Sequence, residues 1–238
     1  MTIISLNRGN PRRADAGGCS NLGSRSPSGE QGLVDFFKIE LSDGSLLFIK
    51  DYYLDSLAFS NLSAVGKEIP HEEEEALRFA NACFRAERAG LRLIARAEQT
   101  QSGLYRKLKK RGYNTDCVSA VITHFVENDL VNDERYAERW LRSRLARKGG
   151  KIKGPRRLLA ALGNRGISRE ALKGAFDKVL DEEAEFTLLQ RFLTKNRIGN
   201  VPGAYSIRGR LKYEGFSSLV INRYLDETAG VNTFYFHR

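Results

Sequence analysis

The chain has 238 residues, enough for one large domain or two small ones with a substantial core, so disulfide or metal staples are not needed for folding. Lysine and arginine total 39 against 29 acidic residues, a net charge of +10, which favours a polyanionic partner such as nucleic acid or a membrane surface. The longest purely apolar run, Leu46 to Ile49, is far shorter than the roughly 18 residues of a membrane span, so no membrane partner is expected.

The positive charge is concentrated in the middle of the chain. Ala76 to Ala175 contain 23 basic and 9 acidic residues, a net charge of +14, whereas the other residues together carry −4. The three cysteines, Cys19, Cys83 and Cys117, form no C-x-x-C pair, so neither a disulfide framework nor a zinc site is indicated. We expect a reducing, cytoplasmic compartment and no metal or cofactor.

The beginning of the chain combines a polar tail with a small β element. Residues 1–32 are rich in Gly, Ser and Arg and are expected to be disordered. Residues 33–69 contain the short β-type runs Phe36 to Leu41, Leu46 to Lys50 and Tyr52 to Leu54. Asp43-Gly44 between the first two runs predicts a hairpin with a type I′ turn. Because an isolated hairpin is marginally stable, it should pack against a helix.

From His71 onward the apolar spacing is helical, and one motif recurs three times. In each copy a Leu is followed four residues later by Gly, then by an apolar residue, then by Asn or Ser. The copies are Leu108 to Asn114, Leu162 to Ser168 and Leu211 to Ser217. The Gly should end a helix in the left-handed conformation, and the Asn or Ser should cap the next helix.

These motifs divide the helical part into three repeats of three helices each. The expected repeats are residues 70–130, 131–181 and 182–230, followed by a C-terminal tail, 231–238. Because such repeats stack on their neighbours, the predicted fold is a mainly α, elongated array of three tandem three-helix repeats, with a small N-terminal β-hairpin element and a disordered N-terminal tail.

The candidate binding residues are two groups of cations. Eight cations occur within sixteen residues, without a carboxylate among them: Arg142, Arg144, Arg147, Lys148, Lys151, Lys153, Arg156 and Arg157. The second group, on the preceding repeat, comprises Lys107, Lys109, Lys110 and Arg111. Uncompensated cations at this density are typical of a surface for nucleic acid or an acidic protein groove, although an ordinary charged surface is the alternative. Contacts to phosphates would be sensitive to salt and indifferent to base sequence.

Aromatic side chains near these cations have two interpretations. Tyr105, Tyr113, Tyr136 and Trp140 could stack on single-stranded bases. The latter three also occupy core positions of the repeat pattern, and this second interpretation is favoured.

No catalytic constellation is present in the sequence. Gly149 to Gly154 resembles a phosphate-binding loop only in its glycines, because Pro155-Arg156 stand where Lys and Ser or Thr are required. His71, His124 and His237 are isolated, and no pair of nucleophile and base is evident. The chain is therefore not expected to be an enzyme.

The segments "LYRKLKKRGY" and "LVNDERYAERWLRSRLARKGGKIKGPRRLLAALGNRGIS" resemble the RecX family of bacterial regulatory proteins over about Gly66 to Glu227. The resemblance implies a monomeric, non-enzymatic regulator that binds the recombinase RecA on single-stranded DNA. It further implies inhibition of ATP hydrolysis, strand exchange and filament extension, and so control of DNA repair, recombination and the SOS response. The alternatives are a stand-alone DNA-binding regulator of the helix-turn-helix type and a helical scaffold that binds only proteins.

Overall fold

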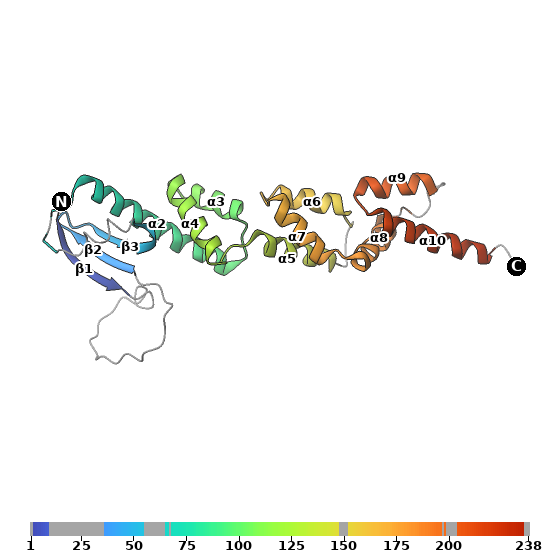
Figure 1. Ribbon diagram of the computed structural model, residues 1–238, viewed down its shortest axis with the longest axis horizontal. Coiled ribbons are helices and arrows are strands. Elements are labelled where there is room, and N and C mark those ends of the chain that lie inside the picture. The colour runs from blue at the N-terminus through green and yellow to red at the C-terminus, as the bar shows by residue number, and fades with distance from the viewer. Residues whose placement is uncertain are drawn as a thin grey trace, which may run out of the picture. The chain divides into compact units, whose positions relative to one another are not determined.

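The computed structural model describes residues 2–9, 36–54, 65–66, 68–147, 152–196, 198 and 204–235 (Figure 1). Three strands are followed by a 3-10 helix and nine α-helices within these ranges: β1 (Ile3–Gly9), β2 (Phe36–Leu41), β3 (Leu46–Ile49), η2 (Asp51–Tyr53), α2 (His71–Arg96), α3 (Gln101–Lys110), α4 (Thr115–Glu127), α5 (Asp133–Leu145), α6 (Pro155–Gly163), α7 (Arg169–Val179), α8 (Glu182–Asn196), α9 (Ala204–Glu214) and α10 (Ser218–Tyr235). The prediction of a mainly α fold with a small N-terminal sheet is confirmed. None of the helices in these ranges combines the length and the apolar character needed to cross a membrane.

The sheet is antiparallel in the order β1-β2-β3, and its apolar face packs against α2. Ile39 of β2 and Ile49 of β3 are completely buried. Phe36 and Phe48 place their rings 5.4 Å and 6.0 Å from the ring of Phe84 on α2. The expectation that a helix covers the hairpin is therefore confirmed.

Three details of the N-terminal element differ from the prediction. The turn is not type I′, because only Gly44 has a positive φ, +79°, while the Asp43 carboxylate accepts hydrogen bonds from the backbone N–H and the hydroxyl of Ser45. Residues Tyr52 to Leu54 do not form a strand, because the N–H groups of Tyr53 and Leu54 bond to nearby carbonyls and form η2.

The third difference concerns the expected disordered tail, residues 1–32. Ile3–Gly9 form the edge strand β1, which pairs with β2 along its length and buries Ile3. The expectation of disorder is therefore wrong for the start of the tail, because Ile3 joins the core and backbone hydrogen bonds to β2 hold the strand. Residues 10–35 lie outside the described residues.

Contacts divide the chain into two compact units, which we describe separately. Unit 1 comprises residues 1–97 and 104–130, and unit 2 comprises residues 98–103 and 131–238. The expected succession of three helices is present within each of the ranges 70–130, 131–181 and 182–230. The division into three repeat domains stays a prediction. The expected tail, 231–238, begins too early, because α10 continues to Tyr235.

A buried ion pair joins the sheet of unit 1 to α2. Lys50, directly after β3, donates to the carboxylate of Glu87 on α2, and the two residues are only 7% and 3% exposed. Nearby, the ring of His124 on α4 lies against the ring of Tyr52 at an interplanar angle of 47°, with 4.0 Å between ring centroids, and partial burial lowers the pKa of His124. Polar groups are thus enclosed where η2, α2 and α4 meet.

The three helix-ending glycines adopt the predicted conformation. Gly112, Gly166 and Gly215 have φ values of +86°, +79° and +88°. The following cap residues also behave as expected: Asn114, Ser168 and Ser217 each accept a backbone N–H of the next helix at 3.2–3.3 Å. The repeated motif is therefore a helix stop followed by a helix start.

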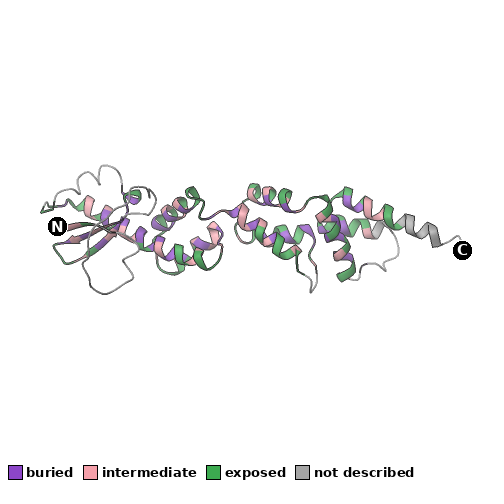
Figure 2. Cartoon of the chain, turned by 90° about the horizontal axis from the view of Figure 1, so that it is seen from below, coloured by how far each residue is buried: buried purple, intermediate pink, exposed green. Residues whose placement is uncertain are grey.

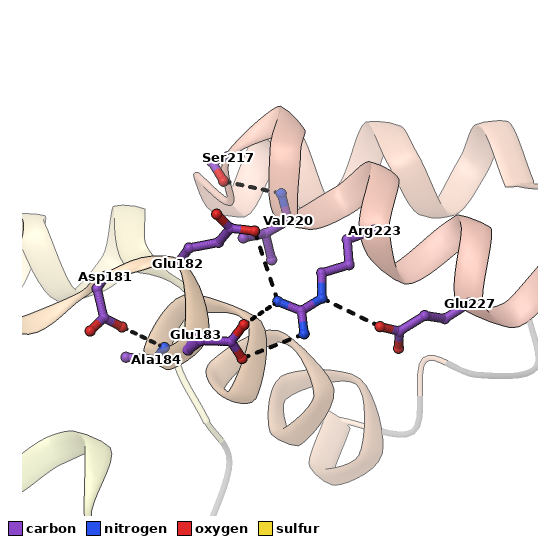
Figure 3. A network of polar contacts seen from close by, with 8 residues as sticks. All are labelled: Asp181, Glu182, Glu183, Ala184, Ser217, Val220, Arg223 and Glu227. Atoms are coloured by element: carbon purple, nitrogen blue, oxygen red, sulfur yellow. Dashed lines mark hydrogen bonds and ion pairs between the residues drawn. The ribbon is translucent and has the colours of Figure 1, made fainter.

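Burial follows the helical period in each unit, with buried residues along one side of a helix and exposed residues along the other (Figure 2). The core of unit 2 includes Leu141, Leu162, Leu189 and Leu211, which come from four different helices. The surface contacts of α8 and α10 are centred on Arg223 (Figure 3). Its guanidinium lies 2.6 Å from Glu183 and 3.8 Å from Glu182, and covers the ring of Phe186.

Substitution of Gly215 by Ala should destabilise unit 2. An added Cβ would lie 2.9 Å from the backbone nitrogen of Arg156, and a positive φ is unfavourable for Ala, so we expect a loss of about 2–3 kcal/mol. Gly209→Ala in the same region is the matched control. That position is helical with open space around it, and Ala should stabilise by about 1 kcal/mol. Urea unfolding followed by Trp140 fluorescence measures both changes, and equal effects would contradict the assignment.

Removal of one member of the buried ion pair should destabilise unit 1. Glu87→Leu leaves the Lys50 ammonium group without its carboxylate, and we expect a loss of about 3–5 kcal/mol. The double variant Lys50→Met/Glu87→Leu should recover most of that loss, because no unpaired charge remains. Urea unfolding followed by circular dichroism tests the pair. A double variant no more stable than the single variant would show that packing, rather than pairing, explains the effect.

Candidate nucleic-acid interface

The predicted cations of the second repeat lie on α5, on α6 and on the segment between them, which we call the α5–α6 basic segment (Arg142–Arg157). Helix α5 begins at the N-cap Asn132, whose side chain accepts the N–H of Arg135 at 3.0 Å. Acidic residues occupy its first turn, and Arg142 and Arg144 occupy its last turn, where cations favour the helix dipole. Part of the cation density therefore also stabilises the end of α5.

Helix α8 binds the backbone of this segment on both sides of residues 148–151. The guanidinium of Arg191 donates to the backbone carbonyls of Leu145 and Arg147 at the end of α5. The side-chain amide of Asn196 donates to the carbonyl of Ile152 at 3.0 Å, on the other side of residues 148–151. The end of α5 and the approach to α6 are thus attached to one rigid helix.

Three of the predicted cations surround one hollow. Arg144, Arg147 and Lys153 are exposed and line a concave site of ≈400 Å³ in unit 2. The indole of Trp140 and the guanidinium of Arg165 line the same site. Lys148 and Lys151 lie outside the described residues.

Arg142, Arg156 and Arg157 have partners within the protein. Arg142 lies 3.9 Å from Glu138, one turn earlier on α5. Arg156 donates to the carbonyl of Tyr213 at 3.3 Å and its guanidinium carbon lies 4.3 Å from the ring centroid. Arg157 forms an ion pair at 3.4 Å with Glu214, which is 6% exposed.

The prediction that the positive charges of this segment have no compensating partners within the protein is therefore wrong for these three arginines. The partner groups are supplied from outside the run, by the preceding turn of α5 and by the end of α9 in the third repeat. Arg156 and Arg157 connect α6 to α9, so part of their role is structural.

The second predicted group, Lys107, Lys109, Lys110 and Arg111, lies at the end of α3 in unit 1 and in the turn after it. Lys109 is half-buried and its ammonium group donates to the hydroxyl of Thr115 at 2.8 Å. Arg111 is exposed and its guanidinium reaches the carbonyl of Ala89 on α2 at 3.5 Å. Lys107 and Lys110 are exposed. This group forms a basic helix end on its own unit.

Arg165 is a candidate residue that sequence reasoning missed. Its guanidinium lies beside Trp140, 5.5 Å from the ring centroid, and donates to the hydroxyl of Tyr136 at 3.2 Å. The repeat pattern contained a usable signal, because Arg165 directly precedes the helix-ending Gly166, as Arg111 precedes Gly112. Arg111 and Arg165 each fold back onto the first helix of their own repeat.

The burial of the four aromatic residues lies between that expected for exposed stacking surfaces and that expected for core positions. Tyr105, Tyr113, Tyr136 and Trp140 are all half-buried. Tyr136 and Trp140 pack against the core of unit 2, as the repeat pattern predicts, and Trp140 also reaches the hollow. The described residues contain no group of three or more His, Cys, Asp or Glu side chains placed to hold a metal ion.

These observations define a class of protein: a mainly α chain built from tandem three-helix repeats. Its α5–α6 basic segment lies on the first two helices of the second repeat and between them. A model of the second three-helix domain of RecX matches residues 132–175, which include the whole of that segment. The chain belongs to the RecX family of regulatory proteins. It is 33% identical over 168 residues to the regulatory protein RecX of Treponema pallidum (strain Nichols), covering 70% of this chain and 99% of that relative.

Further relatives agree with this assignment. The regulatory protein RecX of Mycobacterium sp. (strain JLS) is 29% identical over 170 residues, covering 68% of this chain and 86% of the relative. A crystal structure of a regulatory protein RecX superimposes with a TM-score of 0.62 at 19% identity, covering 94% of this chain and 98% of the other. The solved structure supports the fold.

Neutralising Arg157 should weaken the contact between α6 and α9. Arg157→Met leaves the buried Glu214 carboxylate without its ion-pair partner, and we expect a loss of about 1–3 kcal/mol in the stability of unit 2. Lys153→Met is the control, because Lys153 is exposed and lines the hollow, and it should change stability by less than about 0.5 kcal/mol. Urea unfolding followed by Trp140 fluorescence compares them. Equal stability of both variants and the wild type would remove the structural role of Arg157.

Proposed function

We propose that this chain binds the filament of the recombinase RecA on single-stranded DNA and inhibits its ATP hydrolysis, strand exchange and extension, without catalysing a reaction itself. The observation that carries the proposal is the exposed cationic side of the α5–α6 basic segment, in a chain of the RecX family. The proposed contact residues are the predicted cations of this segment together with the basic end of α3. Contacts to DNA would be to phosphates, and the chain would act as a monomer in the cytoplasm.

Within the α5–α6 basic segment, Arg144, Arg147 and Lys153 carry the largest share of the proposed interaction. They are exposed, and none of the ion pairs described above involves them. A phosphate near them would therefore not have to displace an internal carboxylate. Arg156 and Arg157 would contribute less, since part of their charge is already balanced by Glu214 and the contact with Tyr213.

Recombinase ATPase activity tests the proposal. The purified wild-type chain, in stoichiometric excess over recombinase on single-stranded DNA, should lower the rate of ATP hydrolysis. The variant Arg144→Glu/Arg147→Glu/Lys153→Glu should require at least about 10-fold more protein for the same inhibition, because three attractive contacts become repulsive.

The matched control reverses three exposed cations of α9: Arg208→Glu/Arg210→Glu/Lys212→Glu. It makes the same change in net charge on the same unit and should inhibit nearly as well as the wild type. Unchanged ATP turnover with excess wild-type chain would refute the proposal. Equal loss in both triple variants would show that net charge, rather than the α5–α6 basic segment, determines binding.

Binding to DNA alone separates the alternatives. The proposed function predicts binding that weakens steeply between about 50 and 200 mM salt, as expected for phosphate contacts, and is indifferent to base sequence. Sequence-specific binding to duplex DNA that survives raised salt would instead favour a helix-turn-helix regulator. Inhibition that survives the loss of all DNA binding would favour a scaffold that contacts only protein.

A further inference from the structure

The hollow in unit 2 has an unusual combination of linings. Four cations surround it: Arg144, Arg147, Lys153 and Arg165. The indole of Trp140, aliphatic side chains from α5, α6 and α8, and Ile152 before α6 form the rest of the lining, and none of the described lining residues is acidic. Its volume of ≈400 Å³ lies within the range of small-ligand sites, about 300–1,000 Å³.

Trp140 is held in place by two guanidinium groups. The Arg144 guanidinium carbon lies 5.0 Å from the indole ring centroid, and that of Arg165 lies 5.5 Å from it. Arg165 is anchored by its hydrogen bond to the Tyr136 hydroxyl. Its Nε–H is buried and has no hydrogen-bond partner within the described part of the chain, so one donor of this guanidinium is not used by those residues.

A ligand that matches this lining needs a flat apolar surface next to oxyanions. Exposed phosphates of a nucleic-acid backbone need only cations, and would not require the indole or the aliphatic floor. An acidic peptide would satisfy the arginines but would not use the aromatic ring. A nucleotide uses both, because unstacked bases stack on aromatic rings and on arginine planes while their phosphates bind cations.

We propose that this hollow binds one unstacked nucleotide of single-stranded nucleic acid, with the base against Trp140 and Arg165 and the adjoining phosphates on Arg144, Arg147 and Lys153. The inference rests on the proposed function, which brings single-stranded DNA to this unit. It adds a site for a base to a surface that otherwise contacts phosphates. Because the bases of a duplex are already stacked and paired, the site would distinguish single strands from duplexes.

The chain offers a direct reporter, since Trp140 is its only tryptophan. Titration with an oligothymidylate long enough to cover unit 2 should quench the fluorescence of Trp140 saturably. A duplex of the same length, and an abasic oligonucleotide with the same number of phosphates, should bind with much less quenching. Binding itself is followed independently by the anisotropy of labelled DNA.

Two variants make the test specific. Arg165→Gln removes the guanidinium that is proposed to lie against the base and should weaken oligothymidylate binding about 10-fold, as expected for the loss of one stacking partner. Arg210→Gln is the control on the same unit, because Arg210 is exposed on α9 and does not line the hollow, and it should retain the full quenching amplitude. Circular dichroism verifies folding. If Arg165→Gln does not fold, Arg147→Gln/Lys153→Gln replaces it, with the same expectation.

The outcomes separate this inference from the proposed function. Anisotropy that shows DNA binding without quenching, or equal quenching by the abasic strand, would overturn the nucleotide site and leave the proposed function standing. Quenching by polyglutamate but not by oligothymidylate would assign the hollow to an acidic peptide instead. Absence of any DNA binding would overturn the site as well, and the ATPase assay would then decide the proposed function separately.

Discussion

The left-handed glycine that ends the second helix of each three-helix repeat is the constraint on which the rest of the fold depends. Gly112, Gly166 and Gly215 reverse the chain in one residue, so the third helix can return along the first. Side chains are excluded at two of these turns by close neighbours as well as by φ, because a Cβ on Gly166 would meet Ser102 and one on Gly215 would meet the backbone of Arg156. Because this reversal has a fixed direction, the third helix of each repeat packs against the first, and the core of the repeat forms between them.

The candidate interface depends on residues that do not belong to it. Arg191 and Asn196 of α8 bind backbone carbonyls of the α5–α6 basic segment on both sides of residues 148–151, so the cations next to those carbonyls are placed by the third repeat. Glu214, at the end of α9, pairs with Arg157 in the same way. This arrangement explains how many cations can lie close together with limited electrostatic repulsion. Residues outside the segment neutralise some of the cations and hold the backbone next to the others.

The structure thereby separates cations that are equivalent in the sequence. Arg156 and Arg157 contact Tyr213 and Glu214 and contribute to packing, whereas Arg144, Arg147 and Lys153 line a hollow with Trp140. Arg165, which lies outside that run in the sequence, joins them. A surface built in this way would suit the proposed binding of phosphates and, at the hollow, of one nucleotide.

The sequence by itself determined the helix stops and caps, the helical repeat and the concentration of positive charge, because each of these depends on a few neighbouring residues: Gly for a positive φ, Ser or Asn for the N-cap, and apolar side chains at helical spacing. It wrongly predicted disorder at the start of the tail and a type I′ conformation for the turn at Asp43-Gly44, where strand pairing and side-chain hydrogen bonds decide the outcome. Only the tertiary structure decided which cations are paired, since Glu214 lies 57 residues from Arg157 in the chain. Only it brought Arg165 to Trp140, because a hollow is formed by packing between helices and has no local signature.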